Sequence, residues 1–185
     1  MPGELRIIGG EWRGRRFPVG HAAGLRPTAD RNRETLFNWL QGRVEGRRVL
    51  DLFAGTGALG LEALSRGAGH AVFVERARPV ARSLSALVQR LEASHRSEVV
   101  TADARRYLET RTGPFDLVFL DPPFKADLLE GVMARLQSGE WLAPGARIYV
   151  ESGRAEIPLS MPVGWSSLRE KTAGGVRYGL FKVPG

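Results

Sequence analysis

From residue 48 onward, short apolar runs alternate with longer stretches of helical periodicity, and this alternation limits the fold more than any other feature. It is typical of βαβ units, which build a mainly parallel sheet. Apolar spacings of three and four predict a helix around residues 80–91 and another over Ala126–Gln137. The expected strands are Arg48–Phe53, Ala71–Glu75, Glu98–Thr101, Asp116–Leu120 and Arg147–Glu151.

The two ends of the chain depart from this alternation. Trp165–Lys171 and Val176–Val183 predict an antiparallel hairpin, because Ala173-Gly174-Gly175 between them favours a tight turn. Leu5–Ile8 and Glu11–Phe17 predict a smaller hairpin ahead of the main fold. We therefore expect an α/β fold with a doubly wound, mainly parallel sheet of seven strands and a small N-terminal β-hairpin extension.

A length of 185 residues indicates one domain with a small appendage. We expect residues 1–28 to form a basic hairpin and loop, and residues 29–185 to form the main domain. A helix is predicted near Arg31–Leu40, with Asp30 as its N-cap. The prolines and glycines between Glu151 and Trp165 argue against a full crossover helix there.

Several classes of protein are excluded by composition. The chain has no cysteine, which removes disulfide scaffolds and thiolate metal sites, and its three scattered histidines have no metal-ligand spacing. We therefore expect no metal. The sequence has no apolar run of transmembrane length, and its first residues do not resemble a signal peptide. A cytoplasmic protein without a membrane partner is expected.

A glycine-rich segment follows the first strand of the βαβ series. The sequence Asp51-Leu-Phe-Ala-Gly-Thr-Gly-Ala-Leu-Gly contains G-x-G-x-x-G and precedes a helix. Gly55 and Gly57 would allow the tight turn and the close approach of a ligand. Many nucleotide-binding folds share this pattern, so an NAD-dependent oxidoreductase remains open at this point.

Three carboxylates are expected at the carboxyl edge of the sheet, where ligands bind in such folds. Glu75 ends the second strand and can accept both hydroxyls of a ribose. Asp51 would repel a pyrophosphate but can pair with an ammonium group, which favours S-adenosylmethionine over NAD. Asp103 can accept a hydrogen bond from an adenine amino group, although it could instead cap the helix that follows. The expected cofactor contacts are Asp51, Phe53, Gly55, Gly57, Glu75, Asp103 and Ala104.

A rigid Asp121-Pro122-Pro123-Phe124 segment follows the fourth strand. The prolines exclude a helix and fix the turn. Asp121 and the Pro122 carbonyl can accept the two protons of an exocyclic amine, and Phe124 can stack on the ring of a base. This arrangement would position the amine for in-line attack on a methyl sulfonium, with Asp121 also able to accept a proton.

These two motifs make the chain similar to the class I S-adenosylmethionine-dependent methyltransferases that modify exocyclic amines through an (Asp/Asn)-Pro-Pro-aromatic motif. The N-terminal residues narrow the resemblance to the bacterial small-subunit rRNA guanine-N2 methyltransferase family, RsmD. The segments that carry it are Arg6-Ile-Ile-Gly-Gly10, Arg13-Gly-Arg15, and Arg26-Pro-Thr28 with Arg31, Arg33 and Glu34.

The RsmD resemblance runs from about residue 5 to about residue 182 and implies a Rossmann-like class I fold. It implies transfer of one methyl group to N2 of guanine 966 in 16S rRNA, within 30S or nearly assembled particles. It also implies that Asp121 is the catalytic residue. A monomer is expected. The alternatives are a DNA adenine-N6 methyltransferase and a non-catalytic RNA-binding or assembly factor on the same fold.

Arginine accounts for 24 of the 27 basic residues, and residues 1–48 hold ten arginines and most of the net charge of +7. Arginine suits phosphate and guanine contacts, so we expect this region to dock RNA. Trp12 and Phe17, which lie among these arginines, could stack on bases or pack on the domain. The expected RNA contacts are Arg6, Arg13, Arg15, Arg16, Arg26 and Arg31.

Overall fold

The computed structural model describes residues 3–19, 30–110, 113–123, 126–153 and 160–185. Its main feature is a seven-stranded sheet with the strand order β5-β4-β3-β6-β7-β9-β8. The strands are β3 (Arg48–Asp51), β4 (His70–Glu75), β5 (Ser97–Thr101), β6 (Phe115–Leu120), β7 (Leu142–Gly153), β8 (Ser166–Ala173) and β9 (Val176–Lys182).

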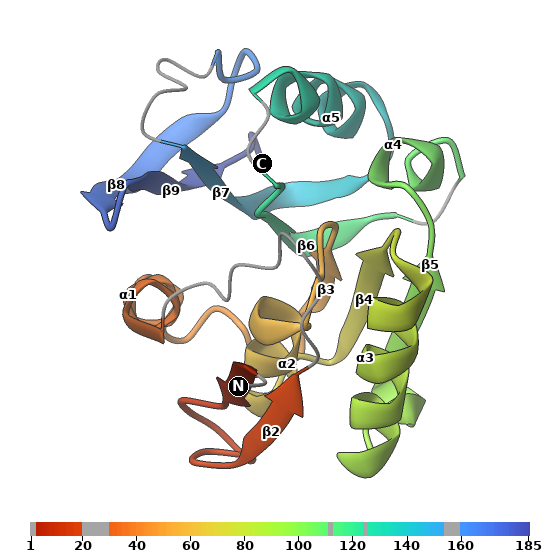
Figure 1. Cartoon of the computed structure of the whole chain (residues 1–185). Helices are drawn as coiled ribbons and strands as arrows, with labels where there is room; N and C mark the ends of the chain where they lie inside the picture. The colour runs from red at the N-terminus through yellow and green to blue at the C-terminus, as the bar shows by residue number, and fades with distance from the viewer. Residues whose placement is uncertain (1–2, 20–29, 111–112, 124–125, 154–159) are drawn as a thin grey trace.

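The first five strands of this sheet are parallel, and helices cover both faces, as predicted (Figure 1). One face packs against α1, α2 and α3, and the other packs against α4 and α5. Within the described ranges, no helix is long and apolar enough to cross a membrane. The helices are α1 (Asp30–Trp39), α2 (Ala58–Ser65), α3 (Arg78–Arg90), α4 (Ala104–Tyr107) and α5 (Ala126–Ser138), with a short 3₁₀ turn at Ser94–Arg96.

The predicted C-terminal hairpin is confirmed, and it extends the sheet in the antiparallel sense. Ala173 pairs with Val176 across a two-residue turn in which Gly174 and Gly175 both have positive φ, the geometry that a tight hairpin requires. Strand β9 lies between β7 and β8 and pairs with both. The chain therefore reverses direction next to β7, and β9 brings its own side chains beside the end of that strand.

The predicted N-terminal hairpin is present, but its strands differ from the expected ones. They are β1 (Gly3–Arg6) and β2 (Arg16–Val19), so most of the predicted Glu11–Phe17 strand is a turn. Gly10 and Gly14 have positive φ and bend the chain at both ends of this turn. Trp12 and Phe17 are buried and belong to the same apolar cluster as α2 and α3. Packing on the domain, rather than base stacking, is therefore their role in this structure.

Other boundaries differ in smaller ways. Strand β7 begins five residues earlier than predicted, at Leu142, and β3 ends two residues earlier, at Asp51. Asp30 is the first residue of α1 rather than its N-cap, and its carboxylate accepts a hydrogen bond from Arg33 Nη2 at 2.9 Å. The domain boundary expected at residue 28 and residues 154–159 of the unusual connection before β8 lie outside the described residues.

Candidate methyl-transfer site

Four of the predicted acidic residues lie at the carboxyl ends of adjacent parallel strands. Asp51 ends β3, Glu75 ends β4, Asp103 follows β5 and Asp121 follows β6. These strands are neighbours in the sheet in the order β5-β4-β3-β6. The fold therefore brings together carboxylates that are up to 70 residues apart in the sequence.

Glu75 holds the glycine loop against the end of β4. Its Oε2 accepts a hydrogen bond from Gly55 N at 3.0 Å, and its Oε1 accepts one from Ala77 N at 2.7 Å. The loop turns through positive φ at Gly55 and Gly57, and a Cβ at Gly57 would lie only 2.4 Å from Leu84 Cδ1. Glu75 therefore fixes the loop in addition to its predicted role at a ribose.

Asp51 is a buried carboxylate at the start of the same loop. Its Oδ2 accepts a hydrogen bond from Gly60 N, in the first turn of α2, at 2.9 Å. Burial raises the pKa of Asp51 to about 7; the Gly60 hydrogen bond opposes this, whereas the charges of Asp121 and Glu75 add to it. A cation placed beside Asp51 would relieve this accumulation of negative charge.

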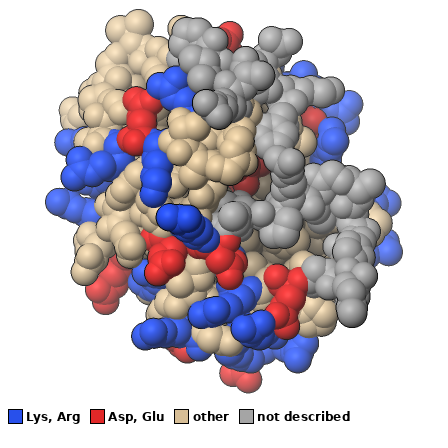
Figure 2. Space-filling model, turned by 60° about the vertical axis from the view of Figure 1, so that its left-hand side comes forward, with Lys and Arg blue, Asp and Glu red and all other residues tan. Residues whose placement is uncertain are grey.

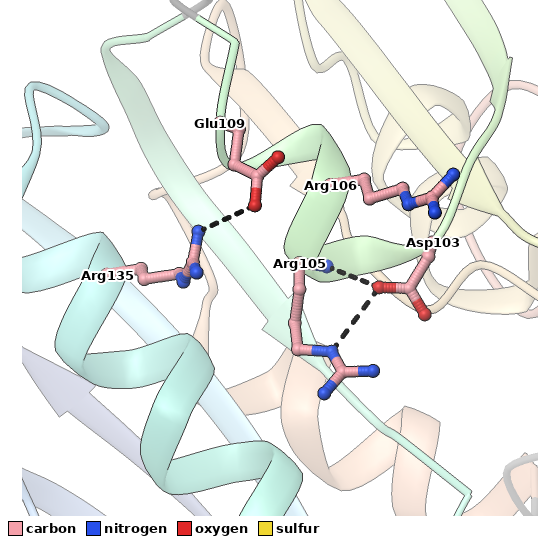
Figure 3. A pocket seen from close by; sticks show the side chains of 5 residues that line it. All are labelled: Asp103, Arg105, Arg106, Glu109 and Arg135. Atoms are coloured by element: carbon pink, nitrogen blue, oxygen red, sulfur yellow. Dashed lines mark hydrogen bonds and ion pairs between the residues drawn. The ribbon is translucent and has the colours of Figure 1, made fainter.

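Asp103 caps α4, as the sequence analysis allowed in place of a contact with adenine. Its Oδ1 accepts a hydrogen bond from Arg105 N at 2.9 Å. Slight burial raises the pKa of Asp103, but the backbone hydrogen bond and the guanidinium of Arg105 outweigh it, so the pKa lies below its usual value. Asp103 stays ionised, and its other carboxylate oxygen makes no contact with Arg105 in Figure 3.

A hollow of about 460 Å³ lies between α4 and α5, beside Asp103 (Figure 3). Arg135 of α5 reaches toward Glu109 across it, with 3.4 Å between Nη1 and Oε1. Ala104, a predicted cofactor contact, is buried in α4. Phe53, another predicted contact, is partly buried and packs against the apolar cluster that contains Ala104. The hollow is lined by Asp103, Arg105, Arg106, Glu109 and Arg135.

The Asp-Pro-Pro segment lies at the end of β6, next to β3. Asp121 is half-buried, Pro122 is buried and Pro123 is exposed. Asp51 pairs with Phe119 of β6, two residues before Asp121, and the charge of Asp121 contributes to the raised pKa of Asp51. Phe124, the predicted stacking residue, lies outside the described residues.

The sequence reasoning missed a second polar group on the other side of Asp121. Tyr149 Oη donates a hydrogen bond to Glu151 Oε2 at 2.8 Å on β7, and Tyr178 lies opposite Glu151 on β9. All three residues are buried. The available signal was Glu151 itself, an acidic residue directly after the apolar run of residues 148–150 in β7.

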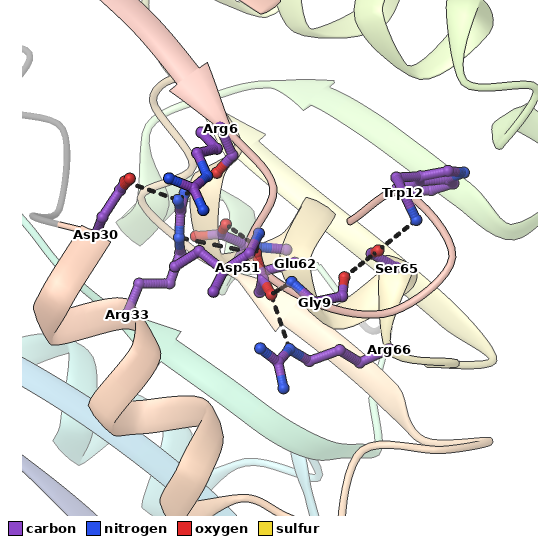
Figure 4. Close-up of polar contacts among 11 residues, drawn as sticks. Arg6, Gly9, Trp12, Asp30, Arg33, Asp51, Glu62, Ser65 and Arg66 are labelled. Carbon is purple, nitrogen blue, oxygen red and sulfur yellow. Dashed lines mark hydrogen bonds and ion pairs between the residues drawn. The ribbon is translucent and has the colours of Figure 1, made fainter. Parts of the chain in front are cut away.

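The N-terminal hairpin is joined to α2 through buried polar contacts (Figure 4). Glu62 is fully buried and accepts hydrogen bonds from Ile8 N at 2.9 Å, Gly9 N at 2.8 Å and Arg66 Nε at 2.7 Å. Arg33 of α1 is also fully buried, with Nε 3.8 Å from Glu62 Oε2. One of the arginines of the basic N-terminal region is therefore internal and cannot contact RNA.

The predicted RNA contacts on the hairpin are exposed at Arg6, Arg13, Arg15 and Arg16. Arg16 forms an ion pair with Glu4 at 2.7 Å. Arg31 is exposed on α1, and Arg26 lies outside the described residues. On the face shown in Figure 2, basic and acidic side chains are interspersed. The described surface therefore presents individual arginines rather than one continuous basic area on that face.

Comparisons with known proteins cover nearly the whole chain. A family model described as "Conserved hypothetical protein 95" matches residues 5–182. The chain is 47% identical to "Ribosomal RNA small subunit methyltransferase D" of Escherichia coli K12 over 97% of its own length and 90% of that protein. The solved structure of the Escherichia coli protein yhhF superposes with a TM-score of 0.92 at 44% identity, covering 98% of this chain and 99% of that one.

A more distant likeness concerns the fold alone. The structure of "T. Thermophilus 16S rRNA N2 G1207 methyltransferase (RsmC) in complex with AdoMet and Guanosine" matches with a TM-score of 0.68 at 22% identity, covering all of this chain and 50% of that one. The matched fold is the same doubly wound sheet described above.

Proposed function

We propose that this chain, which belongs to the family described as "Conserved hypothetical protein 95", methylates N2 of a guanine in 16S rRNA. Its curated relatives include ribosomal RNA small subunit methyltransferase D. The methyl donor would be S-adenosylmethionine. The observation that carries this proposal is the placement of Asp51 and Asp121 at the carboxyl ends of the adjacent parallel strands β3 and β6. One can hold a cationic donor and the other an amine acceptor. With this activity, we expect the protein to act in the cytoplasm and as a monomer.

The residues at the edge of the sheet fit the donor. The buried carboxylate of Asp51 is surrounded by negative charge and suits the ammonium of the amino-acid moiety. Glu75 can accept ribose hydroxyls on the lone pairs that Gly55 and Ala77 do not use. Asp103 can accept a hydrogen bond from the adenine amine. When bound, S-adenosylmethionine supplies an electrophilic methyl group on its sulfonium.

Asp121 and Pro122 would hold the target amine. Conjugation with the ring makes the exocyclic nitrogen of guanine a poor nucleophile. If both of its protons bond to the Asp121 carboxylate and the Pro122 carbonyl, the nitrogen becomes more electron-rich and faces the methyl group. Catalysis then consists mainly of positioning, and Asp121 can take the proton that leaves the amine.

The pH dependence of cofactor binding should report on Asp51. Only the ionised carboxylate attracts the ammonium, so a pKa of about 7 in the free protein means that affinity should rise with pH. The dissociation constant of S-adenosylmethionine, measured by calorimetry, should be about tenfold lower at about pH 8 than at about pH 6. An Asp51→Asn variant should lose the part of this dependence that Asp51 causes. An identical pH profile in the variant would contradict the assignment.

The exposed hairpin arginines should contribute to RNA binding. Replacing Arg13 and Arg15 together with alanine should weaken RNA binding and reduce its salt dependence by about 0.7 to 0.9 per lost phosphate contact on a log–log plot. Arg169→Ala, which removes an exposed arginine on β8, should leave both quantities unchanged. Filter binding at a series of salt concentrations measures both, and equal slopes for all three proteins would exclude the hairpin as an RNA surface.

The test of the activity is to methylate 30S particles and naked 16S rRNA with labelled S-adenosylmethionine and to map the modified base. We expect 2-methylguanosine at one position, with assembled particles as the better substrate. In a parallel reaction with DNA as substrate, labelled adenine would favour the adenine-N6 alternative. RNA binding without transfer to any substrate would favour the non-catalytic one.

A further inference from the structure

A row of three polar side chains crosses the carboxyl edge of the sheet beyond the cofactor residues. Phe119 pairs with Tyr149 in the parallel register of β6 and β7, and each is followed two residues later by an acid, Asp121 and Glu151. Glu151 pairs in turn with Tyr178 of β9. Phe119, Tyr149 and Tyr178 belong to the apolar cluster of α1 and α2. Because side chains alternate along a strand, Glu151 lies on the same face, and Asp121 follows β6 directly at its edge. The row therefore runs Asp121, Glu151, Tyr178 across three adjacent strands.

Glu151 and Tyr178 are held in fixed positions inside the protein. Glu151 is 7% exposed, and its carboxylate accepts the hydrogen bond from Tyr149 Oη at 2.8 Å. The Tyr178 ring packs between Trp39, with 5.6 Å between ring centroids, and Tyr149, with 6.2 Å. The hydrogen bond from Tyr149 orients Glu151, whose carboxylate belongs to a class of group that can accept several hydrogen bonds.

The hydroxyl of Tyr178 has an unmet hydrogen-bonding capacity. Tyr178 is 1% exposed, and among the described residues its Oη has no hydrogen-bond partner. A buried hydroxyl in this state destabilises a protein, because it has lost its hydrogen bonds to water without gaining others. Such a group beside a substrate site is explained if a ligand atom completes it, and the missing partner would be an acceptor for the hydroxyl proton.

We propose that Glu151 and Tyr178 recognise the Watson–Crick edge of the target guanine, which rests on the proposed guanine-N2 activity. Along that edge guanine presents the N2 amine, the N1 proton and the O6 oxygen, in this order. The row in the protein offers an acceptor at Asp121, an acceptor at Glu151 and a donor at Tyr178, in the same order. Glu151 is thus a specificity-determining residue that accepts the N1 proton, and Tyr178 donates to O6.

The same row excludes adenine. If the N6 amine of adenine lay at Asp121, the neighbouring ring nitrogen N1 would be an acceptor and would face the Glu151 carboxylate. Two acceptors repel each other, and a site built around a hydrogen bond rejects an analogue that cannot make it by large factors. The row therefore separates guanine from adenine, even though an Asp-Pro-Pro segment can hold the amine of either base.

The proposal predicts a change of selectivity toward 2-aminopurine, which keeps the N2 amine but lacks the N1 proton and O6. The substrates are rRNAs ligated from two segments, with guanine or 2-aminopurine at the modified position. The wild-type protein should prefer guanine by about 10³-fold in kcat/KM. Glu151→Gln keeps an acceptor for Tyr149 and can donate to N1 of 2-aminopurine. It should lower kcat/KM for guanine by about 100-fold and reduce the preference to about tenfold or less.

Tyr178→Phe provides a second variant that keeps the packing against Trp39. It should lower kcat/KM for guanine by about tenfold and leave that for 2-aminopurine unchanged, because 2-aminopurine has no O6 to lose. Glu170→Gln is the matched control, since this acid of β8 pairs with Arg177. Its selectivity should equal that of the wild type. All variants should bind S-adenosylmethionine with wild-type affinity.

Two outcomes would overturn the proposal. Glu151→Gln could keep the wild-type preference for guanine over 2-aminopurine, whether both rates stay the same or fall equally. Tyr178→Phe could lower transfer to both bases equally. Either result, together with guanine-N2 transfer by the wild type, rejects this inference alone. No transfer to guanine N2 by the wild-type protein rejects the proposed function as well.

Discussion

Replacing Asp121 with alanine should lower the rate of methyl transfer by about 10³-fold, because the amine then loses both a positioning acceptor and a proton acceptor. Cofactor binding should be nearly intact, since the proposed contact of Asp121 is with the base rather than with the donor. Single-turnover transfer to 30S particles measures the chemical step, and calorimetry measures cofactor affinity. Wild-type transfer by this variant would show that Asp121 is not catalytic.

Two further measurements would test the role of Asp121. Asp121→Asn keeps a carbonyl acceptor for the amine, so it should retain more activity than the alanine variant. Loss of the Asp121 charge should also lower the pKa of Asp51, because that charge helps to raise it. The pH at which cofactor affinity rises should then shift downward in both variants. A shift in Asp121→Ala without loss of activity would place Asp121 near the donor but outside the reaction.

Replacing Glu62 with alanine should lower the free energy of unfolding by about 3–5 kcal/mol, the usual effect of leaving a buried charge without its partner. Burial lowers the pKa of Arg33, while Glu62 and then Asp30 raise it, so Glu62 is the principal charge that compensates the guanidinium. Arg33 Nη2 also donates to the Arg6 carbonyl, but among the described residues its Nε and Nη1 have no hydrogen-bond partner. The variant would also leave the Ile8 and Gly9 amides without their acceptor.

Urea denaturation followed by circular dichroism measures this loss. Glu34→Gln, which changes an exposed acid on α1, should stay within about 0.5 kcal/mol of the wild type. A double-mutant cycle with Arg33→Met separates the ion pair from the amide contacts. If Glu62→Ala unfolds at the wild-type urea concentration, the hairpin is not anchored through this residue.

The fold was predictable from local patterns because buried apolar residues recur at different spacings in strands and in helices. Three residues with the predicted helical spacing in α3, namely Leu84, Leu87 and Val88, are ones that the structure buries. The carboxyl-edge rule also placed Asp51, Glu75, Asp103 and Asp121 together, since parallel strands end at the same edge. The roles assigned to these residues at the cofactor and the base stay predictions.

Features that depend on pairing between distant segments could not be read from the sequence. Tyr178 lies beside Glu151 only because β9 inserts between β7 and β8, and no local pattern specifies that insertion. Trp12 turns inward because its amide donates to Ser65 Oγ at 2.9 Å, a contact across 53 residues. The burial of Arg33 could not be predicted, because its partner Glu62 lies 29 residues away in a helix of mostly apolar residues.

Helix α2 connects the glycine loop to the N-terminal hairpin at a fixed distance. Its first turn is tied to the cofactor loop through the bond from Gly60 to Asp51, and its last turn is tied to the hairpin through Glu62 and Ser65 (Figure 4). All eight of its residues are buried, so it cannot shift without disturbing the core. At 1.5 Å per residue, α2 spans about 12 Å. One inserted residue would rotate one set of anchors by about 100° relative to the other, so the length of this helix sets the orientation of the glycine loop relative to the N-terminal hairpin.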